Sequence, residues 1–412
     1  MAFKQNVFYL AIVQISQYII PLITFPYLTR TLTAEGFGEL GFYTAIFAYV
    51  ILITEYGFSL TATAEIAKNK TDKKELNRVF WSVINIKLLL AVTSTILAFS
   101  LAIIFLEESS KILILACFVP AAIGNVVYPV WFFLGLGEMK FITLSTLLAK
   151  TISIPITFWI VNSPEDVGLA ALIQSSTILL SGLISVFLIK RNNYVGKYEF
   201  NFYFMKETFI NGYHVFLGTV SVNLYTSSTV FILGLISGSY FVGLFNAANT
   251  LVKSAISMFN PIYQALFPKL TETFKRDKIE GFSIVKKTGT LALLLSLLAT
   301  LPLIVFSSEI IELIVGKGYE DSVLVLKILS ATIPLSVVNN ILGVQTLLPL
   351  GYKKNFLNIV MFGAVLNIVI MPVLCYYLNA AGAALSVLMT EITMMILLIR
   401  TNIKIRRLVV NA

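Results

Sequence analysis

The stretch QISQYIIPLITFPYLTRTLTAEGFGELGFYTA, residues 14–45, is the best guide to how the rest of the chain is built. It begins as an apolar run, carries Pro21 and Pro26 near its far end, and continues into a glycine-containing turn and a second apolar run. Proline removes a backbone donor and clashes with the preceding helical turn. In a membrane such a bend is tolerated where neighbouring protein or a water-filled cavity satisfies the freed carbonyls. We therefore expect a helix hinge at Pro21 and Pro26.

Arg30 follows directly after PYLT, at the end of this first apolar run. A guanidinium binds phosphate with a bidentate fork and stays charged at every physiological pH. We predict that Arg30 binds an anionic head group at the rim of a cavity. The alternative is that Arg30 only extends to the head groups of the surrounding lipids.

The composition is that of an integral membrane protein. Hydrophobic residues make up 58% of the 412 residues and charged residues 12%, against roughly 45–50% and about 25% in soluble domains. The two cysteines, Cys117 and Cys375, lie in different apolar runs, and His214 is the single histidine. This inventory predicts no disulfide, no metal site, no cofactor and no catalytic nucleophile–base pair.

Apolar runs of about 20 residues are long enough to cross the roughly 30 Å hydrocarbon core of a bilayer. We count twelve such runs, so the sequence predicts an all-α membrane protein with twelve transmembrane helices. Their approximate bounds are 6–29, 40–64, 80–106, 111–135, 142–162, 167–189, 209–236, 240–266, 288–307, 322–349, 356–378 and 381–400.

The positions of Lys and Arg predict the orientation of these spans. With the N-terminus in the cytoplasm, 23 of the 30 basic residues fall on the cytoplasmic side, three fall outside, and four lie within spans. This asymmetry predicts that both termini are cytoplasmic. It also accounts for nearly all of the net charge of +9, so we expect no nucleic-acid partner.

An internal repeat predicts two lobes. A shift of 214 positions brings Asn125 onto Asn339 and Gly137 onto Gly351, and it also aligns the sixth span with the twelfth. Transporter folds are commonly built from such duplications. We predict a six-helix lobe at 1–189, a cytoplasmic linker at 190–208 and a second six-helix lobe at 209–412.

Ionisable residues inside the predicted spans are costly and are candidates for function. Lys87 and Lys150 lie at a similar depth, about 13 Å from the cytoplasmic boundary, and Glu55 is the expected counter-charge for one of them. Lys253 and Glu391 lie near the middle of their spans and permit a second pair. We expect Lys87, Lys150 and Lys253 to bind an anionic head group together with Arg30. The alternative for Lys87 and Lys150 is that their long side chains extend to the membrane interface. Glu55, Glu391 and His214 are candidates for cation coupling. Alternatively, the two carboxylates are structural partners of a lysine, and the histidine is a hydrogen-bonded packing residue.

Three segments carry a resemblance to a known family. PLITFPYLTRTLTAEGFGELGFYTA, GFSLTATAEIAKNK (57–70) and YPVWFFLGLGEMKF (128–141) resemble O-unit flippases of the Wzx type. These flippases form a polysaccharide-biosynthesis branch of the MOP transporter superfamily, which also contains the MATE exporters. Where the family pattern is PYLxRxLG, this chain has Thr33 in place of the glycine, and we expect Gly36 and Gly38 to make the turn instead.

The resemblance implies a flippase that moves undecaprenyl-diphosphate-linked oligosaccharide units, of O-antigen or a related surface polysaccharide, to the periplasmic leaflet by alternating access. The location would be the bacterial cytoplasmic (inner) membrane. The expected partners are the lipid-linked substrate, the bilayer and polysaccharide polymerase or chain-length proteins, with coupling to H⁺ or Na⁺. Two alternatives remain at this point: a MATE-like small-molecule antiporter and a membrane enzyme of glycan assembly.

Overall fold

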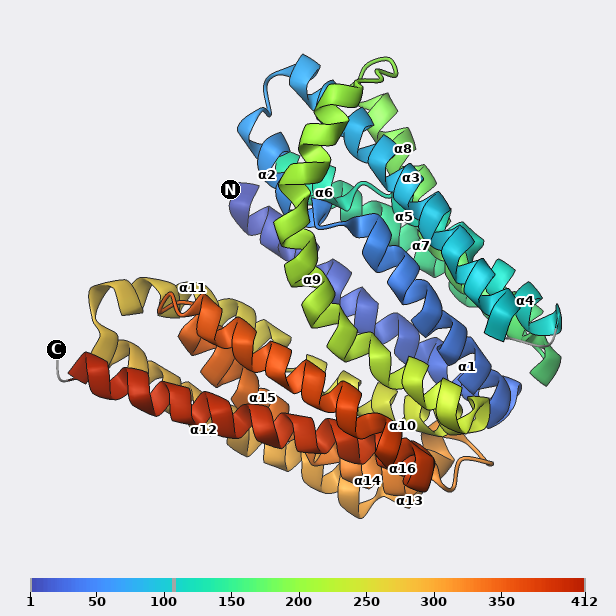
Figure 1. Ribbon diagram of the computed structural model, residues 1–412, viewed down its shortest axis with the longest axis vertical. Helices are drawn as coiled ribbons and strands as arrows, with labels where there is room; N and C mark the ends of the chain where they lie inside the picture. Colours follow the sequence, from blue (N-terminus) through green and yellow to red (C-terminus); the bar gives the residue numbers. More distant parts are fainter. Residues whose placement is uncertain (1, 106–108, 411–412) are drawn as a thin grey trace. The chain divides into compact units, whose positions relative to one another are not determined.

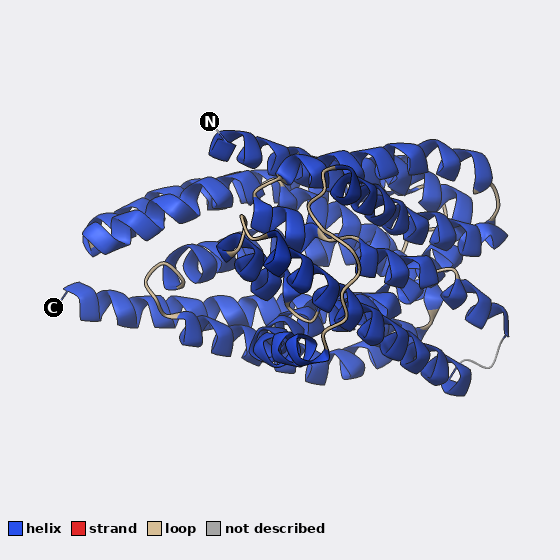
Figure 2. Ribbon diagram, turned by 90° about the horizontal axis from the view of Figure 1, so that it is seen from above, coloured by secondary structure: helices blue, strands red, loops and turns tan. Residues whose placement is uncertain are grey.

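The computed structural model describes the backbone of residues 2–105 and 109–410, and their side chains except those of 2–22, 105, 109–110, 214, 217–227 and 408–410. The regular secondary structure of these residues is helical, joined by turns and loops, and no strand occurs among them (Figure 2). The chain divides into two compact units, Met1–Asn223 and Leu224–Ala412.

Unit 1 is a bundle of helices around the long first helix. Helix α1 contacts α3, α5, α7 and α8, and Figure 1 shows α3, α5, α7 and α8 side by side. The helices are α1 (Ala2–Glu55), α2 (Phe58–Lys68), α3 (Lys73–Phe105), α4 (Ser109–Ala116), α5 (Val119–Val127), α6 (Val130–Leu136), α7 (Met139–Ile160), the 3₁₀ turn η1 (Pro164–Asp166), α8 (Val167–Arg191) and α9 (Phe202–Ser237), the last of which continues into unit 2.

Unit 2 is a second bundle, in which α10 and α12 pack against α14, α15 and the long C-terminal helix. Its elements are α10 (Ser239–Ser257), α11 (Asn260–Arg276), α12 (Lys278–Val305), α13 (Ser307–Ile310), the π-helix η2 (Ile311–Val315), α14 (Ser322–Ser330), α15 (Thr332–Leu342), the π-helix η3 (Gly343–Leu347) and α16 (Lys353–Val410).

Eight helical segments of the described chain are long and apolar enough to cross a membrane. Two of them are longer than one predicted span, because α1 and α16 each continue across a single non-helical residue, Thr33 and Asn379. The chain is therefore a multi-pass membrane protein, and the number twelve stays a prediction.

The break in α1 differs from the expected one. The non-helical residue is Thr33, with φ 63° and ψ 175°, whereas Gly36 and Gly38 lie within helix. That combination of φ and ψ is almost exclusive to glycine, which explains why the family pattern has glycine at this position. The expectation that Gly36 and Gly38 make the turn was wrong.

Several predicted spans are interrupted for local reasons. Between α1 and α2, Gly57 has φ 80°, and a Cβ there would lie 2.7 Å from Val215 Cγ1. Between α5 and α6, Pro129 has no N–H to continue the helical hydrogen bonds. The interruptions divide apolar runs that look continuous in sequence.

Two aligned pairs of the predicted repeat adopt the same local structure. Gly137 and Gly351 both have positive φ, 81° and 86°. Two residues after each glycine a long helix begins, α7 at Met139 and α16 at Lys353. The 214-residue shift therefore matches helix starts as well as residue types.

Candidate functional site

The clearest charged cluster in unit 1 joins α1, α3 and α5. Lys87 Nζ lies 2.8 Å from Glu55 Oε1, and Asn125 Nδ2 donates to the same oxygen at 2.9 Å. The Lys87 side chain is 0% exposed and that of Glu55 is 31% exposed. The structure thus selects Lys87, of the two lysines considered, as the partner of Glu55.

This pairing changes the electrostatic balance of unit 1. A buried cation is tolerated when a carboxylate and further hydrogen bonds replace its hydration. Lys87 meets this condition through Glu55, so it can bind a second anion only if that pair separates. Asn125 was notable in the sequence only as part of the repeat, and its amide in an apolar run is the signal that could have identified it.

Lys150 has a different environment. It lies on one face of α7 together with four hydroxyl residues, because residues three or four positions apart are neighbours on a helix. We call this face the hydroxyl stripe. It consists of Thr143, Thr146, Lys150, Ser153 and Thr157. Each hydroxyl donates to a backbone carbonyl one turn earlier, at 2.8–3.2 Å.

Two features make Lys150 the strongest anion-binding candidate of unit 1. Its side chain is half-buried, and the hydrogen bonds and ion pairs recorded among the described residues include none from its Nζ. Of the hydroxyls in the stripe, those of Thr143, Thr146 and Thr157 are buried, and Thr146 also hydrogen-bonds Tyr128. Ser153, half-buried one turn from Lys150, is the hydroxyl best placed to meet the same ligand.

The end of the first apolar run is fixed against α7. Tyr27 Oη donates to Val161 O at 2.5 Å, and its ring lies 4.4 Å from that of Phe158. Arg30, one turn beyond Tyr27, has an exposed side chain. The contact places Arg30 at the same end of unit 1 as the C-terminus of α7.

The second expected pair is not formed. In unit 2, Asn339 Nδ2 donates to Glu391 Oε2 at 2.6 Å and to Glu391 O at 3.0 Å. Lys253 is exposed on α10 and is absent from the ion pairs recorded in the described part of the chain. Asn339 and its repeat partner Asn125 therefore each bind a carboxylate within their own unit.

Three further candidates are Pro21, Pro26 and His214. The side chains of Pro21 and His214 lie outside the described residues. Pro26 is half-buried within helical backbone. The proline hinge and the coupling role of His214 remain predictions.

Two of the segments that carry the family resemblance have a structural role. Helix α2, from GFSLTATAEIAKNK, packs against α6, from YPVWFFLGLGEMKF. Thr63 Oγ1 donates to Trp131 O at 3.1 Å, and Ile66, Phe132 and Phe133 are fully buried in the same core. These motifs hold the α2–α6 end of unit 1 together, and the candidate ligands lie outside them.

No group of three or more His, Cys, Asp or Glu residues suited to a metal ion was found in the part of the chain that the structure describes. The candidate groups around Lys150 are a cation and hydroxyls, whereas the carboxylates of Glu55 and Glu391 each accept a hydrogen bond from an asparagine. A cation with hydroxyl neighbours favours a ligand that is an anion with oxygen atoms.

Comparison with known proteins identifies the family of the chain. The family described as "Polysaccharide biosynthesis protein" matches residues 3–274. A relative from Escherichia coli (strain K12), named "Putative O-antigen transporter", is 37% identical over 405 residues, covering 98% of each chain.

Two solved structures have a similar fold. One is an inward-facing multidrug resistance MATE family transporter of the MOP superfamily, with TM-score 0.78, 16% identity and 98% of each chain covered. The other is the lipid II flippase MurJ in an inward closed conformation, with TM-score 0.71, 13% identity, and 96% of this chain and 87% of that chain covered. At these identities the likeness concerns the fold alone.

Proposed function

The chain belongs to the polysaccharide biosynthesis protein family, and from this premise we propose that it is a flippase for a lipid-linked oligosaccharide. The substrate we propose is an undecaprenyl-diphosphate-linked repeat unit of O-antigen or a related surface polysaccharide. The direction is from the cytoplasmic to the periplasmic leaflet of the bacterial inner membrane. The E. coli relative named as an O-antigen transporter supports this assignment, and it favours transport over catalysis.

The observation that carries the proposal is the contrast between Lys87 and Lys150. The charge of Lys87 is neutralised by Glu55 at 2.8 Å, whereas Lys150 is half-buried and has no recorded ion pair. An unneutralised cation within an apolar helix is costly and is retained where an anion reaches it. The diphosphate of the substrate is such an anion.

The hydroxyl stripe of α7 completes the chemistry. A diphosphate cannot enter hydrocarbon without replacing its hydration, and Lys150 with the half-buried Ser153 offers a charge and a hydroxyl. Lys150 lies eight residues before Phe158, which is about 12 Å along the helix, and Phe158 contacts Tyr27 near Arg30. We propose that the diphosphate meets Lys150 first and Arg30 later in transit.

The remaining elements of the mechanism are proposals of the same kind. Two six-helix lobes would move relative to each other in alternating access, with both termini cytoplasmic. Cation coupling through Glu55 or Glu391 would require H⁺ or Na⁺ to compete with the asparagine that now donates to each carboxylate. Polysaccharide polymerase and chain-length proteins are the proposed protein partners.

The test combines export with abundance. In a strain lacking the native gene, we expect Lys150→Ala and Lys150→Glu to lose surface glycan and to accumulate lipid-linked oligosaccharide in the inner leaflet. Lys150→Arg should retain export, because an anion ligand requires the positive charge. Lys140→Ala is the matched control, since it removes an exposed cation from the same helix.

Full export by Lys150→Ala, at normal protein abundance, would contradict the role of Lys150. Extrusion of small cationic compounds by purified protein, without movement of the lipid-linked oligosaccharide, would support the antiporter alternative. Glycosyl transfer by the purified protein would support the enzyme alternative.

A further inference from the structure

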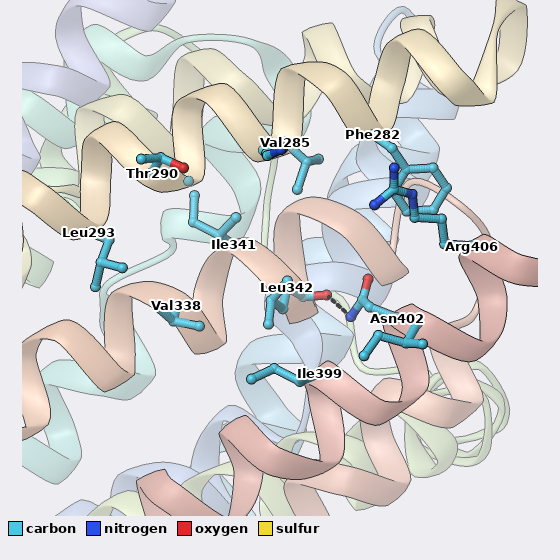
Figure 3. Close-up of a pocket in the computed structure, with 13 residues that line it drawn as sticks. Phe282, Val285, Thr290, Leu293, Val338, Ile341, Leu342, Ile399, Asn402 and Arg406 are labelled. Atoms are coloured by element: carbon cyan, nitrogen blue, oxygen red, sulfur yellow. Dashed lines mark hydrogen bonds between the residues drawn. The ribbon is translucent and has the colours of Figure 1, made fainter.

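Unit 2 contains a groove that the transport proposal does not use. It lies between α12, α15 and α16 and has a volume of about 340 Å³, within the range of roughly 300–1,000 Å³ typical of small-molecule sites. Figure 3 shows the lining side chains of the three helices converging on this space.

The groove has an apolar part and a cationic end. Its apolar walls extend along α12 from Val285 to Leu293, about 12 Å along the helix axis, and are completed by Val338, Ile341 and Ile399. Lys286 and Arg406 line the end nearest the basic C-terminal segment, and Phe282 lines the same groove. None of the described residues that line the groove is acidic.

The two cations are available to a ligand. Both side chains are exposed, and neither takes part in an ion pair among the residues that the structure describes. Apolar walls below two cations match a molecule with an anionic head and a hydrocarbon chain.

Asn402 adds a second, independent observation. Its side chain is 8% exposed and lines the groove one helical turn from Arg406. Its Nδ2 donates to Leu342 O at 3.1 Å (Figure 3) and to Leu398 O at 2.9 Å, which fixes the orientation of the amide. Its Oδ1 is buried and accepts no hydrogen bond within the described structure. A ligand with a hydroxyl donor near its anionic group would satisfy this oxygen.

We propose that this groove binds an anionic glycerophospholipid with a hydroxylated head group. The phosphate contacts Lys286 and Arg406, a head-group hydroxyl donates to Asn402 Oδ1, and an acyl chain lies along the apolar wall. Basic pockets between transmembrane helices bind anionic lipid head groups by the same electrostatics. The inference does not depend on the proposed transport activity, and with the predicted orientation the lipid belongs to the cytoplasmic leaflet.

Native mass spectrometry of the full-length protein in detergent tests the proposal. The probes are dioleoyl phosphatidylglycerol and dioleoyl phosphatidylcholine, added together at equal concentration. We expect phosphatidylglycerol adducts to dominate in the wild-type protein. The variant carrying Lys286→Ala and Arg406→Ala should lose about thirtyfold in affinity for phosphatidylglycerol.

A matched control is available in the neighbouring residues. Lys287→Ala with Arg407→Ala removes the same charge from the same two helices, but neither residue lines the groove, so adducts should remain within about twofold of wild type. The apolar wall is tested without a variant. Dihexanoyl phosphatidylglycerol should compete weakly and inorganic phosphate should not compete.

Equal adducts of the two lipids would overturn the proposal, and so would equal losses in the two double variants. Full competition by inorganic phosphate would show a simple anion site instead. Displacement of phosphatidylglycerol by a lower concentration of undecaprenyl phosphate would show that the occupant is the carrier lipid. Failure of the wild-type protein to restore glycan export in the deletion strain, with phosphatidylglycerol binding intact, would count against the proposed function alone.

Discussion

The Lys87–Glu55 pair gives the sharpest test of the structure of unit 1. We consider three changes: Glu55→Gln, Lys87→Met and the two combined. Glu55→Gln keeps the size of the side chain and an oxygen for Asn125, but it removes the negative charge beside Lys87. Lys87→Met replaces the buried cation with an apolar chain of similar length.

The magnitudes follow from burial and contacts. Lys87 is 0% exposed and 2.8 Å from Glu55, so leaving its charge unpaired should cost about 3–5 kcal/mol. Glu55 is 31% exposed and keeps the Asn125 hydrogen bond in Lys87→Met, so that variant should lose about 1–3 kcal/mol. The combined variant removes both charges and should lie within about 1 kcal/mol of wild type.

The assay exploits the distribution of tryptophan. Trp81, Trp131 and Trp159 are the three tryptophans of the chain and all lie in unit 1. Unfolding in mixed micelles of mild detergent and dodecyl sulfate, followed by tryptophan fluorescence, therefore reports on unit 1. The change in free energy of unfolding is compared among the variants.

The expected order of destabilisation is Glu55→Gln, then Lys87→Met, then the combined variant. Equal loss in Glu55→Gln and in the combined variant would refute the argument, because it would show that no stranded charge is responsible. Lys68→Met is the control. Its pair with Glu65 is exposed at 72% and 43%, so its removal should change stability by less than about 1 kcal/mol.

Thr33→Gly should stabilise unit 1 by about 1 kcal/mol, because φ 63° with ψ 175° is strained for threonine; a decrease in the fluorescence-monitored stability would contradict this. The carboxylate of Asp166 accepts hydrogen bonds from the backbone N–H groups of Asn162, the larger effect, and Ser163, and these bonds hold its pKa below the ordinary value. These bonds stabilise the fold above the ordinary pKa, and the stabilisation is lost as the pH falls through the lowered pKa. Wild type should therefore be more stable to unfolding than Asp166→Asn near neutral pH and lose this difference below about pH 4. A stability difference that does not change with pH would contradict this prediction. Arg30→Ala should abolish most glycan export, and Arg30→Lys should retain only part of it because lysine lacks the bidentate fork of arginine. Full export by Arg30→Ala would mean that Arg30 only contacts the head groups of the surrounding lipids. A cysteine placed at Lys73 should be labelled from the cytoplasm, whereas labelling from outside alone would reverse the predicted orientation.

The sequence by itself determined the class of the protein. Twelve apolar runs and a sparse, asymmetric set of charges identify a helical membrane protein, because hydrocarbon tolerates neither exposed backbone polar groups nor isolated charges. Three short segments were sufficient for the family resemblance, which the match over residues 3–274 confirmed. The cost of a buried charge also identified Lys87, Lys150 and Glu55 before their contacts were known.

The tertiary structure decided which of these residues meet. Depth along a helix placed both lysines level with Glu55, but only rotation about the helix axes, which side-chain packing sets, could select Lys87 and add Asn125. The same holds for Thr33, whose positive φ lies between two helical segments and could not be read from its residue type. It also holds for Lys286 and Arg406, which are 120 residues apart in sequence and line one groove because α12 and α16 pack together. A sequence pattern describes one helix at a time, and contacts between helices depend on the orientation of each about its axis.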